Sequence, residues 1–145
     1  MAKTNIAHLD QDKRADLGVK GTDEWDNNFT YRVDDVFADA TDGTACAAAA
    51  TLGVSFSLCS DGDITVNDLA VAGNNVASLI PVIVVSHGKN WAFAASADEA
   101  DNTDGDAIFV DKEYSATVGA EFDDLMIWIS PHILRTMTVK AGILP

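Results

Sequence analysis

The sequence is short of positive charge. Nine lysines and arginines stand against 23 aspartates and glutamates in 145 residues, which gives a formal net charge of −14 at pH 7. The field around such a chain repels phosphate backbones and anionic lipid headgroups. Nucleic acids are therefore excluded as expected partners.

The chain also lacks a long apolar run. Its longest, "LIPVIVV" at 79–85, is far shorter than the roughly 20 residues of a membrane-spanning helix. The start, "MAKTNIAHLDQDK", is charged and has no apolar signal-peptide core, so targeting gives no compartment. With 48% hydrophobic residues, the chain suits one soluble globular domain over 1–145, with 1–20 as a lead-in to a β-region at 21–145.

Cysteine is scarce. A bridge between the two, Cys46 and Cys59, would close a loop of 14 residues and would indicate an oxidising compartment. Such a loop is worth about 3 kcal/mol in the chain-entropy model. The spacing leaves open two buried free thiols in a cytosolic protein. Zinc is not expected, because neither cysteine has a CxxC partner and His8, His87 and His132 lie in unrelated segments.

Alternating apolar and polar residues are typical of half-buried strands. Phe29, Tyr31 and Val33 alternate with polar residues and predict a strand near 28–34. The same reasoning predicts a hairpin of 53–59 with 64–70 and a strand near 107–115. Two further strands, at 82–85 and 122–130, are apolar throughout and are expected to be buried on both faces.

The chain ends in a predicted helix over 131–141. Ser130 is a good N-cap, Pro131 fits the first helical position, and Gly142 can adopt the left-handed conformation after the last turn. The helix has an apolar stripe that we expect to cover one side of a sheet. Several strands followed by a short helix predict an α+β fold with a mainly antiparallel sheet.

The loop "ADEADNTDGD" at 97–106 concentrates carboxylates of the kind that calcium requires. An EF-hand is excluded, because aligning Gly105 with the turn glycine puts Ala100 at the first ligand position. A looser calcium loop and a solvated acidic turn both remain open.

Nothing in the sequence indicates an enzyme. Ser86 and His87 are adjacent on a predicted strand, so their side chains face opposite ways and cannot easily form a nucleophile and base pair. Glu121, Asp123 and Asp124 have no positioned partner that would identify an acid and a base. We therefore expect a non-enzymatic protein.

Three ordered segments carry a resemblance. "TDEWDNNFTYRV" at 22–33 resembles the "DPWGNxYxYR" motif that opens the β-region of type IV pilin-like proteins, especially the pseudopilins of type II secretion. "VIVVSHGKN" at 82–90 and "EFDDLMIWIS" at 121–130 are similar to two later strands of that family. The sequence departs from the motif at Glu24, where the family has proline, and at Asp26, where it has glycine.

The resemblance implies a pilin-like headgroup that serves as a structural subunit, either a pilin, a minor pilin or a pseudopilin. The expected location is extracytoplasmic, in the bacterial periplasm or on the cell surface. Expected partners are other subunits, or a separate chain that carries the long apolar N-terminal helix, since this sequence starts beyond that helix. Any membrane contact would run through the helix.

The resemblance also implies site residues. Calcium is expected near the last strands, where Asp123 or Asp124 matches the family motif, while Asp104 and Asp106 are added by their chemistry alone. Large rigid aromatic side chains suit packing against a long helix, and those expected to serve as packing or interface residues are Trp25, Phe29, Tyr31 and Trp128. An internal core without an interface is the other interpretation of these aromatics.

Two alternatives to a filament subunit remain open at this point. One is a calcium-stabilised extracellular adhesion or ligand-binding module. The other is a small acidic cytosolic enzyme or salt-adapted domain, which free thiols would favour.

Overall fold

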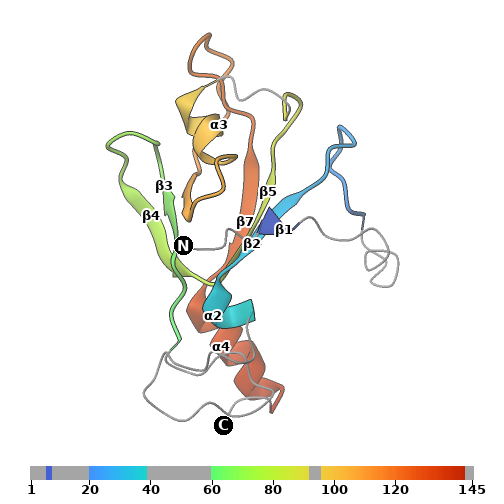
Figure 1. Ribbon diagram of the computed structural model, residues 1–145, viewed down its shortest axis with the longest axis vertical. Coiled ribbons are helices and arrows are strands. Elements are labelled where there is room, and N and C mark those ends of the chain that lie inside the picture. Colours follow the sequence, from blue (N-terminus) through green and yellow to red (C-terminus); the bar gives the residue numbers. More distant parts are fainter. Residues whose placement is uncertain (1–5, 8–19, 39–59, 92–95, 143–145) are drawn as a thin grey trace.

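The computed structural model describes residues 6–7, 20–38, 60–91 and 96–142. These residues form an α+β fold that is mostly sheet, with short helices and a C-terminal helix (Figure 1). The predicted fold class is thereby confirmed. No helix within these ranges has the length and apolar character needed to cross a membrane. The predicted strand at 53–59 and the proposed cysteine bridge lie outside the described residues.

One sheet has four strands in the order β1-β2-β5-β7, and every neighbouring pair is antiparallel. Its strands are β1 (Ile6–Ala7), β2 (Thr30–Val33), β5 (Val82–Ser86) and β7 (Leu125–Ile129). The three longer strands confirm those that alternation and apolar runs predict. β5 lies between β2 and β7, so it occupies an internal place in the sheet.

The second sheet has the order β4-β3-β6. β4 (Asn75–Ile80) pairs antiparallel with β3 (Ile64–Asn67), and β6 (Ile108–Val110) pairs parallel with β3. The prediction of a strand over 107–115 is wrong beyond Val110, because β6 ends there. Further along, Ser115 forms an isolated β-bridge with Phe122. Figure 1 shows the two sheets beside each other, with α3 at one end and α2 and α4 at the other.

The hydrophobic core joins the two sheets. Its buried members come from β3, β4, β5 and β6, and they are Ile64, Val66, Ile80, Ile83, Val85 and Phe109. Met126 and Trp128 of β7 pack against this cluster. Because full burial of one such side chain is worth about 1.5–3 kcal/mol, this seam supplies much of the energy that holds the sheets together.

The prediction that β5 and β7 are buried on both faces is wrong. Ile83 and Val85 are fully buried on the core side, whereas Val84 is 38% exposed, Leu125 65% and Ile127 76%. Successive side chains of a strand point to opposite faces, and the second sheet covers only one of these faces. The other face of β5 and β7 therefore remains apolar and exposed among the described residues.

The C-terminal helix α4 (Pro131–Lys140) forms as predicted. The Ser130 hydroxyl accepts a hydrogen bond from the backbone N–H of Ile133, and Gly142 has a φ of 71°. These are the N-cap and left-handed C-terminal features that the sequence indicates. The stripe expected to cover a sheet is only partly buried, because Ile133 and Met137 are both more than half exposed.

Two shorter helices were not predicted. α2 (Asp35–Ala38) follows β2, and α3 (Ala97–Asp101) occupies the first half of the acidic loop. The Ser96 hydroxyl accepts from the backbone N–H of Glu99 and caps α3. The Ser-x-x-Glu pattern at 96–99 is a recognised helix-start signal and could have predicted this helix.

Candidate functional site

Asp23 anchors the loop that precedes β2 to the end of β5. Its Oδ2 accepts a hydrogen bond of 2.8 Å from the Ser86 hydroxyl, and its Oδ1 accepts bonds of 2.9 Å from the backbone N–H groups of Trp25 and Asn27. Asp23 is only 6% exposed. A buried carboxylate with three donors fixes the loop firmly, so Trp25 has a defined position at its tip.

A second set of bonds joins the same loop to the turn after β5 and to the start of β7. The Asn27 amide donates to the Gly88 carbonyl oxygen at 2.7 Å, and the Lys89 N–H donates to Asp123 Oδ2 at 3.0 Å. Asp26 adopts a φ of 62°, a left-handed conformation. The three segments that carry the pilin-like resemblance therefore meet in one hydrogen-bonded junction.

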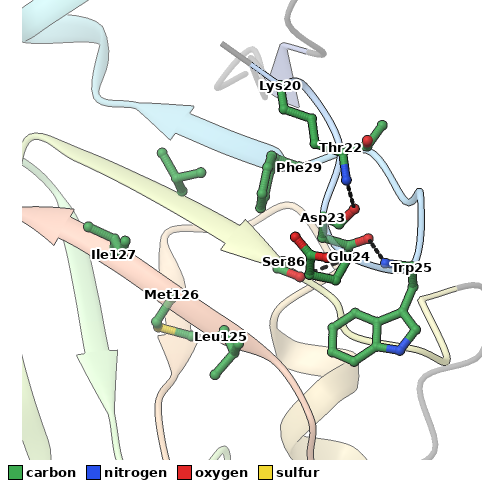
Figure 2. A pocket seen from close by; sticks show the side chains of 11 residues that line it. Lys20, Thr22, Asp23, Glu24, Trp25, Phe29, Ser86, Leu125, Met126 and Ile127 are labelled. Carbon is green, nitrogen blue, oxygen red and sulfur yellow. Dashed lines mark hydrogen bonds between the residues drawn. The ribbon is translucent and has the colours of Figure 1, made fainter.

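Beside this junction lies an apolar groove of about 470 Å³. Figure 2 shows the Trp25 ring near the end of β5 and Leu125, Met126 and Ile127 along β7. The groove is lined by Lys20, Thr22, Asp23, Glu24, Trp25, Phe29, Val84, Ser86, Leu125, Met126 and Ile127. Trp25 is 46% exposed, so much of its ring is open to solvent.

The aromatic residues singled out in the sequence lie on different sides of the sheet. Trp25 and Phe29 line the groove. Tyr31 is the direct partner of Val84 in the ladder, which puts both on the outer face. Trp128 is the partner of Ile83 and packs against the core cluster. The structure therefore brings three of the four to the outer face or its groove and places Trp128 on the core side.

A compact carboxylate cluster lies where α3 meets the start of β7. Glu99, Asp123 and Asp124 each offer an oxygen, and these oxygens lie within 4.8 Å of one another. Glu99 is 2% exposed and Asp124 4%. The Asn90 amide donates to the Glu99 carboxylate at 3.2 Å, and the Asn102 amide donates to Asp124 Oδ2 at 2.8 Å. Buried carboxylates in such proximity form a donor set that suits a divalent cation.

Of the four predicted metal ligands, two lie in the carboxylate cluster and two lie outside it. Asp123 and Asp124 lie together and are joined by Glu99, whereas Asp104 and Asp106 are not members of this cluster. Asp104 Oδ1 instead accepts from the Asp106 N–H at 2.9 Å, and Asp106 Oδ1 accepts from the Ile108 N–H at 2.6 Å. These two aspartates thus stabilise the turn that leads into β6.

Partial burial, and then the negative charges of Asp104, Asp106 and Asp98, raise the pKa of Asp101 above its ordinary value. The acidic loop therefore brings several negative charges close together.

Glu99 belongs to the same loop, but the sequence pattern alone does not separate it from the other carboxylates. Only its position on α3 distinguishes it.

A cleft of about 360 Å³ opens next to the cluster. Its lining includes Glu99, Asp123, Lys89 and the ring of Tyr114, which is 76% exposed. The cleft thus combines carboxylate residues, a lysine and an exposed aromatic residue.

Ser86 and His87 do not contact each other. The Ser86 hydroxyl donates to Asp23, while His87 Nε2 lies 2.9 Å from the Thr30 hydroxyl. Both side chains are buried and face different sides of the sheet, as expected for adjacent strand residues. They do not form the nucleophile and base pair that acyl-transfer chemistry needs.

Comparison with known proteins found no matching family model, no matching curated protein and no matching solved structure.

Proposed function

We propose that this chain is the globular headgroup of a type IV pilin-like or pseudopilin subunit. In this role it is a non-enzymatic structural protein of an extracytoplasmic bacterial filament. The observation that carries the proposal is the exposed apolar face of β5 and β7, together with the groove at its end.

The outer face offers a continuous apolar surface rather than scattered residues. Val84 and Ile127 are direct partners across the β5–β7 ladder, and Leu125 stands two positions from Ile127 on the same face. Contiguous exposed apolar surface on a folded domain is typical of a protein or membrane interaction site. Covering Leu125 and Ile127, which are 65% and 76% exposed, would remove apolar surface from water, and this favours a partner on this face.

An apolar α-helix is the occupant that we propose for this face. A sheet exposing aliphatic rows is most simply covered by the apolar stripe of a helix laid across it. Trp25 and Phe29 at the end of the face add large rigid surfaces that would limit where the helix lies. The pilin-like resemblance supplies the same occupant, because those subunits carry a long apolar helix against their headgroup sheet.

The junction of the three resembling segments supports the proposal from a second side. Asp23, Asn27 and Gly88 hold the loop of Trp25 against the end of β5. Asp26 has a left-handed backbone, a conformation that glycine adopts without strain, so aspartate at this position is compatible with the glycine of the resembling motif.

The role of the apolar face and its groove is tested by introducing a charged side chain there and expressing the variant in cells that produce the protein. Ile127→Asp places a carboxylate on the outer face, and Val118→Asp is the matched control, because Val118 is 92% exposed and is not among the residues that line the groove. We expect both variants to fold and only Ile127→Asp to be lost from sheared surface filaments in an immunoblot. Equal recovery of the two variants, or absence of the wild-type chain from any filament, would contradict the proposal.

Purified without the helix, the wild-type chain is expected to be monomeric or weakly associating in sedimentation. A net charge of −14 adds mutual repulsion between copies, and salt screens that repulsion. A tight oligomer that salt does not affect would count against the proposed role of the helix.

The cleft beside the carboxylate cluster favours a second candidate function, an extracellular ligand-binding module. Exposed Tyr114 beside several carboxylates could hold a ligand by stacking and hydrogen bonding. Ligand screening with the wild type and Tyr114→Ala separates this function from the first, since that substitution leaves the outer sheet face intact.

A further inference from the structure

We propose that His87 is the fourth ligand of a metal site with Glu99, Asp123 and Asp124, and that the site takes a transition-metal ion of the Zn²⁺ class in preference to calcium. The inference does not depend on the filament role. It rests on two buried polar atoms that have no hydrogen-bond partner among the described residues, one nitrogen and one oxygen.

His87 supplies the first of these atoms. The residue is 6% exposed, and its Nδ1 is buried without a hydrogen-bond partner in the described part of the chain. Nδ1 lies 3.8 Å from Asp124 Oδ2, which is too long for a hydrogen bond. Two ligands of one zinc ion, each about 2.1 Å from it, stand about 3.4 Å apart in tetrahedral geometry. His87 is not among the residues whose ligand atoms all lie within 4.8 Å of one another. Its ring and the carboxylates must therefore close by more than about 1 Å for all four groups to bind one ion.

The other ring nitrogen fixes how the imidazole is presented. His87 Nε2 lies 2.9 Å from the Thr30 hydroxyl, to which one tautomer of the ring donates its Nε2–H. In that tautomer Nδ1 has no hydrogen and carries a lone pair on the side of Asp124. Metal-binding histidines usually hold their second nitrogen in this way, because the outer hydrogen bond orients the ring. Thr30 on β2 is thus an orienting residue for His87.

Asp123 supplies the second unpartnered atom. Its Oδ2 accepts from the Lys89 N–H, while its Oδ1 is buried without a partner in the described residues. A buried carboxylate oxygen without a donor is costly, and a bound cation would satisfy it. An imidazolium at His87 paired with Asp124 is the alternative, but it would leave Asp123 Oδ1 unsatisfied.

The donor set decides the class of metal. Calcium takes six to eight oxygen ligands, and its sites are built from carboxylates, carbonyls and water. An imidazole nitrogen instead suits zinc and other transition metals, which also accept carboxylates in four-coordinate sites. One nitrogen and three carboxylates therefore favour Zn²⁺, in contrast to the calcium that the family resemblance implies.

The experiment compares two histidines in the full chain. Protein stripped with a chelator is titrated calorimetrically with Zn²⁺ and with Ca²⁺, and retained metal is counted by mass spectrometry after dialysis. We expect about one Zn²⁺ per chain, bound more tightly than Ca²⁺. His87→Gln should weaken Zn²⁺ binding by about 10- to 100-fold, a loss typical of a perturbed metal site, and leave Ca²⁺ binding unchanged. His132→Gln, at an exposed position of α4, should bind as the wild type does.

Three results would overturn the proposal: no retained Zn²⁺, tighter binding of Ca²⁺, or wild-type Zn²⁺ affinity in His87→Gln. If circular dichroism shows that His87→Gln is unfolded, Asp123→Asn serves instead. An asparagine can still accept from the Lys89 N–H, so the fold is expected to persist while Zn²⁺ affinity falls. Wild-type affinity in this variant would also overturn the site. Ile127→Asp should bind Zn²⁺ normally, so failures of the metal site and of the filament role are distinguishable.

Discussion

Replacing Gly88 by alanine tests the junction on which the candidate site depends. Gly88 has a φ of +61°, and an added Cβ would lie 2.4 Å from Asp123 Cγ and 2.5 Å from its Oδ1. No real Cβ tolerates such distances, so Asp123 must move. The substitution therefore strains the backbone and displaces a carboxylate at the same time.

The expected loss has two parts. A left-handed conformation costs a residue with a side chain about 1–2 kcal/mol. Moving Asp123 breaks its hydrogen bond with the Lys89 N–H, and a bond to a charged group is worth about 1.5–3 kcal/mol. We therefore expect Gly88→Ala to lower the free energy of unfolding by about 2.5–5 kcal/mol.

Gly119 offers a matched control. It has a φ of +80°, but an added Cβ would meet no atom within 4 Å. Gly119→Ala should therefore pay only the backbone part, about 1–2 kcal/mol. Urea unfolding at neutral pH, followed by circular dichroism, measures both variants against the wild type. Equal losses at the two glycines would refute the close approach of Gly88 to Asp123.

Three further predictions concern other parts of the molecule. Burial, and then the neighbouring Asp63, raise the pKa of Asp34 to about 6, above its unfolded value, so folding should strengthen as pH falls. Between pH 7.5 and pH 5, urea titrations should show the free energy of unfolding of the wild type rising by about 1 kcal/mol more than that of Asp34→Asn. Equal increases in the two proteins would contradict this prediction. At left-handed Asp26, replacement by glycine should change stability by less than about 0.5 kcal/mol, whereas valine should cost about 1–2 kcal/mol; similar melting of the two variants would argue against this backbone. Cys46 and Cys59 are predicted to be bridged, and intact masses that do not differ with and without reduction would contradict the bridge.

Local signals in the sequence determined much of the secondary structure. The alternation around Tyr31 predicts β2, the apolar run at 82–85 predicts β5, and Ser130 with Gly142 marks the two ends of α4. These features depend on neighbours a few residues away, because side-chain period and capping bonds are short-range properties. For the same reason, the Ser-x-x-Glu pattern at 96–99 is a local signal for the start of α3.

Tertiary structure alone decided which surfaces are buried and which side chains meet. The residues of β7 are apolar on both faces, so only the position of the second sheet determines that Trp128 is packed and Ile127 is exposed. The bonds of Asp23 to Ser86 and of Lys89 to Asp123 join segments far apart in the chain. The His87 ring likewise comes within 3.8 Å of Asp124, which lies 37 residues further along the chain, only once β5 and β7 have paired. Contacts over such separations depend on how the two sheets pack, which no local pattern records.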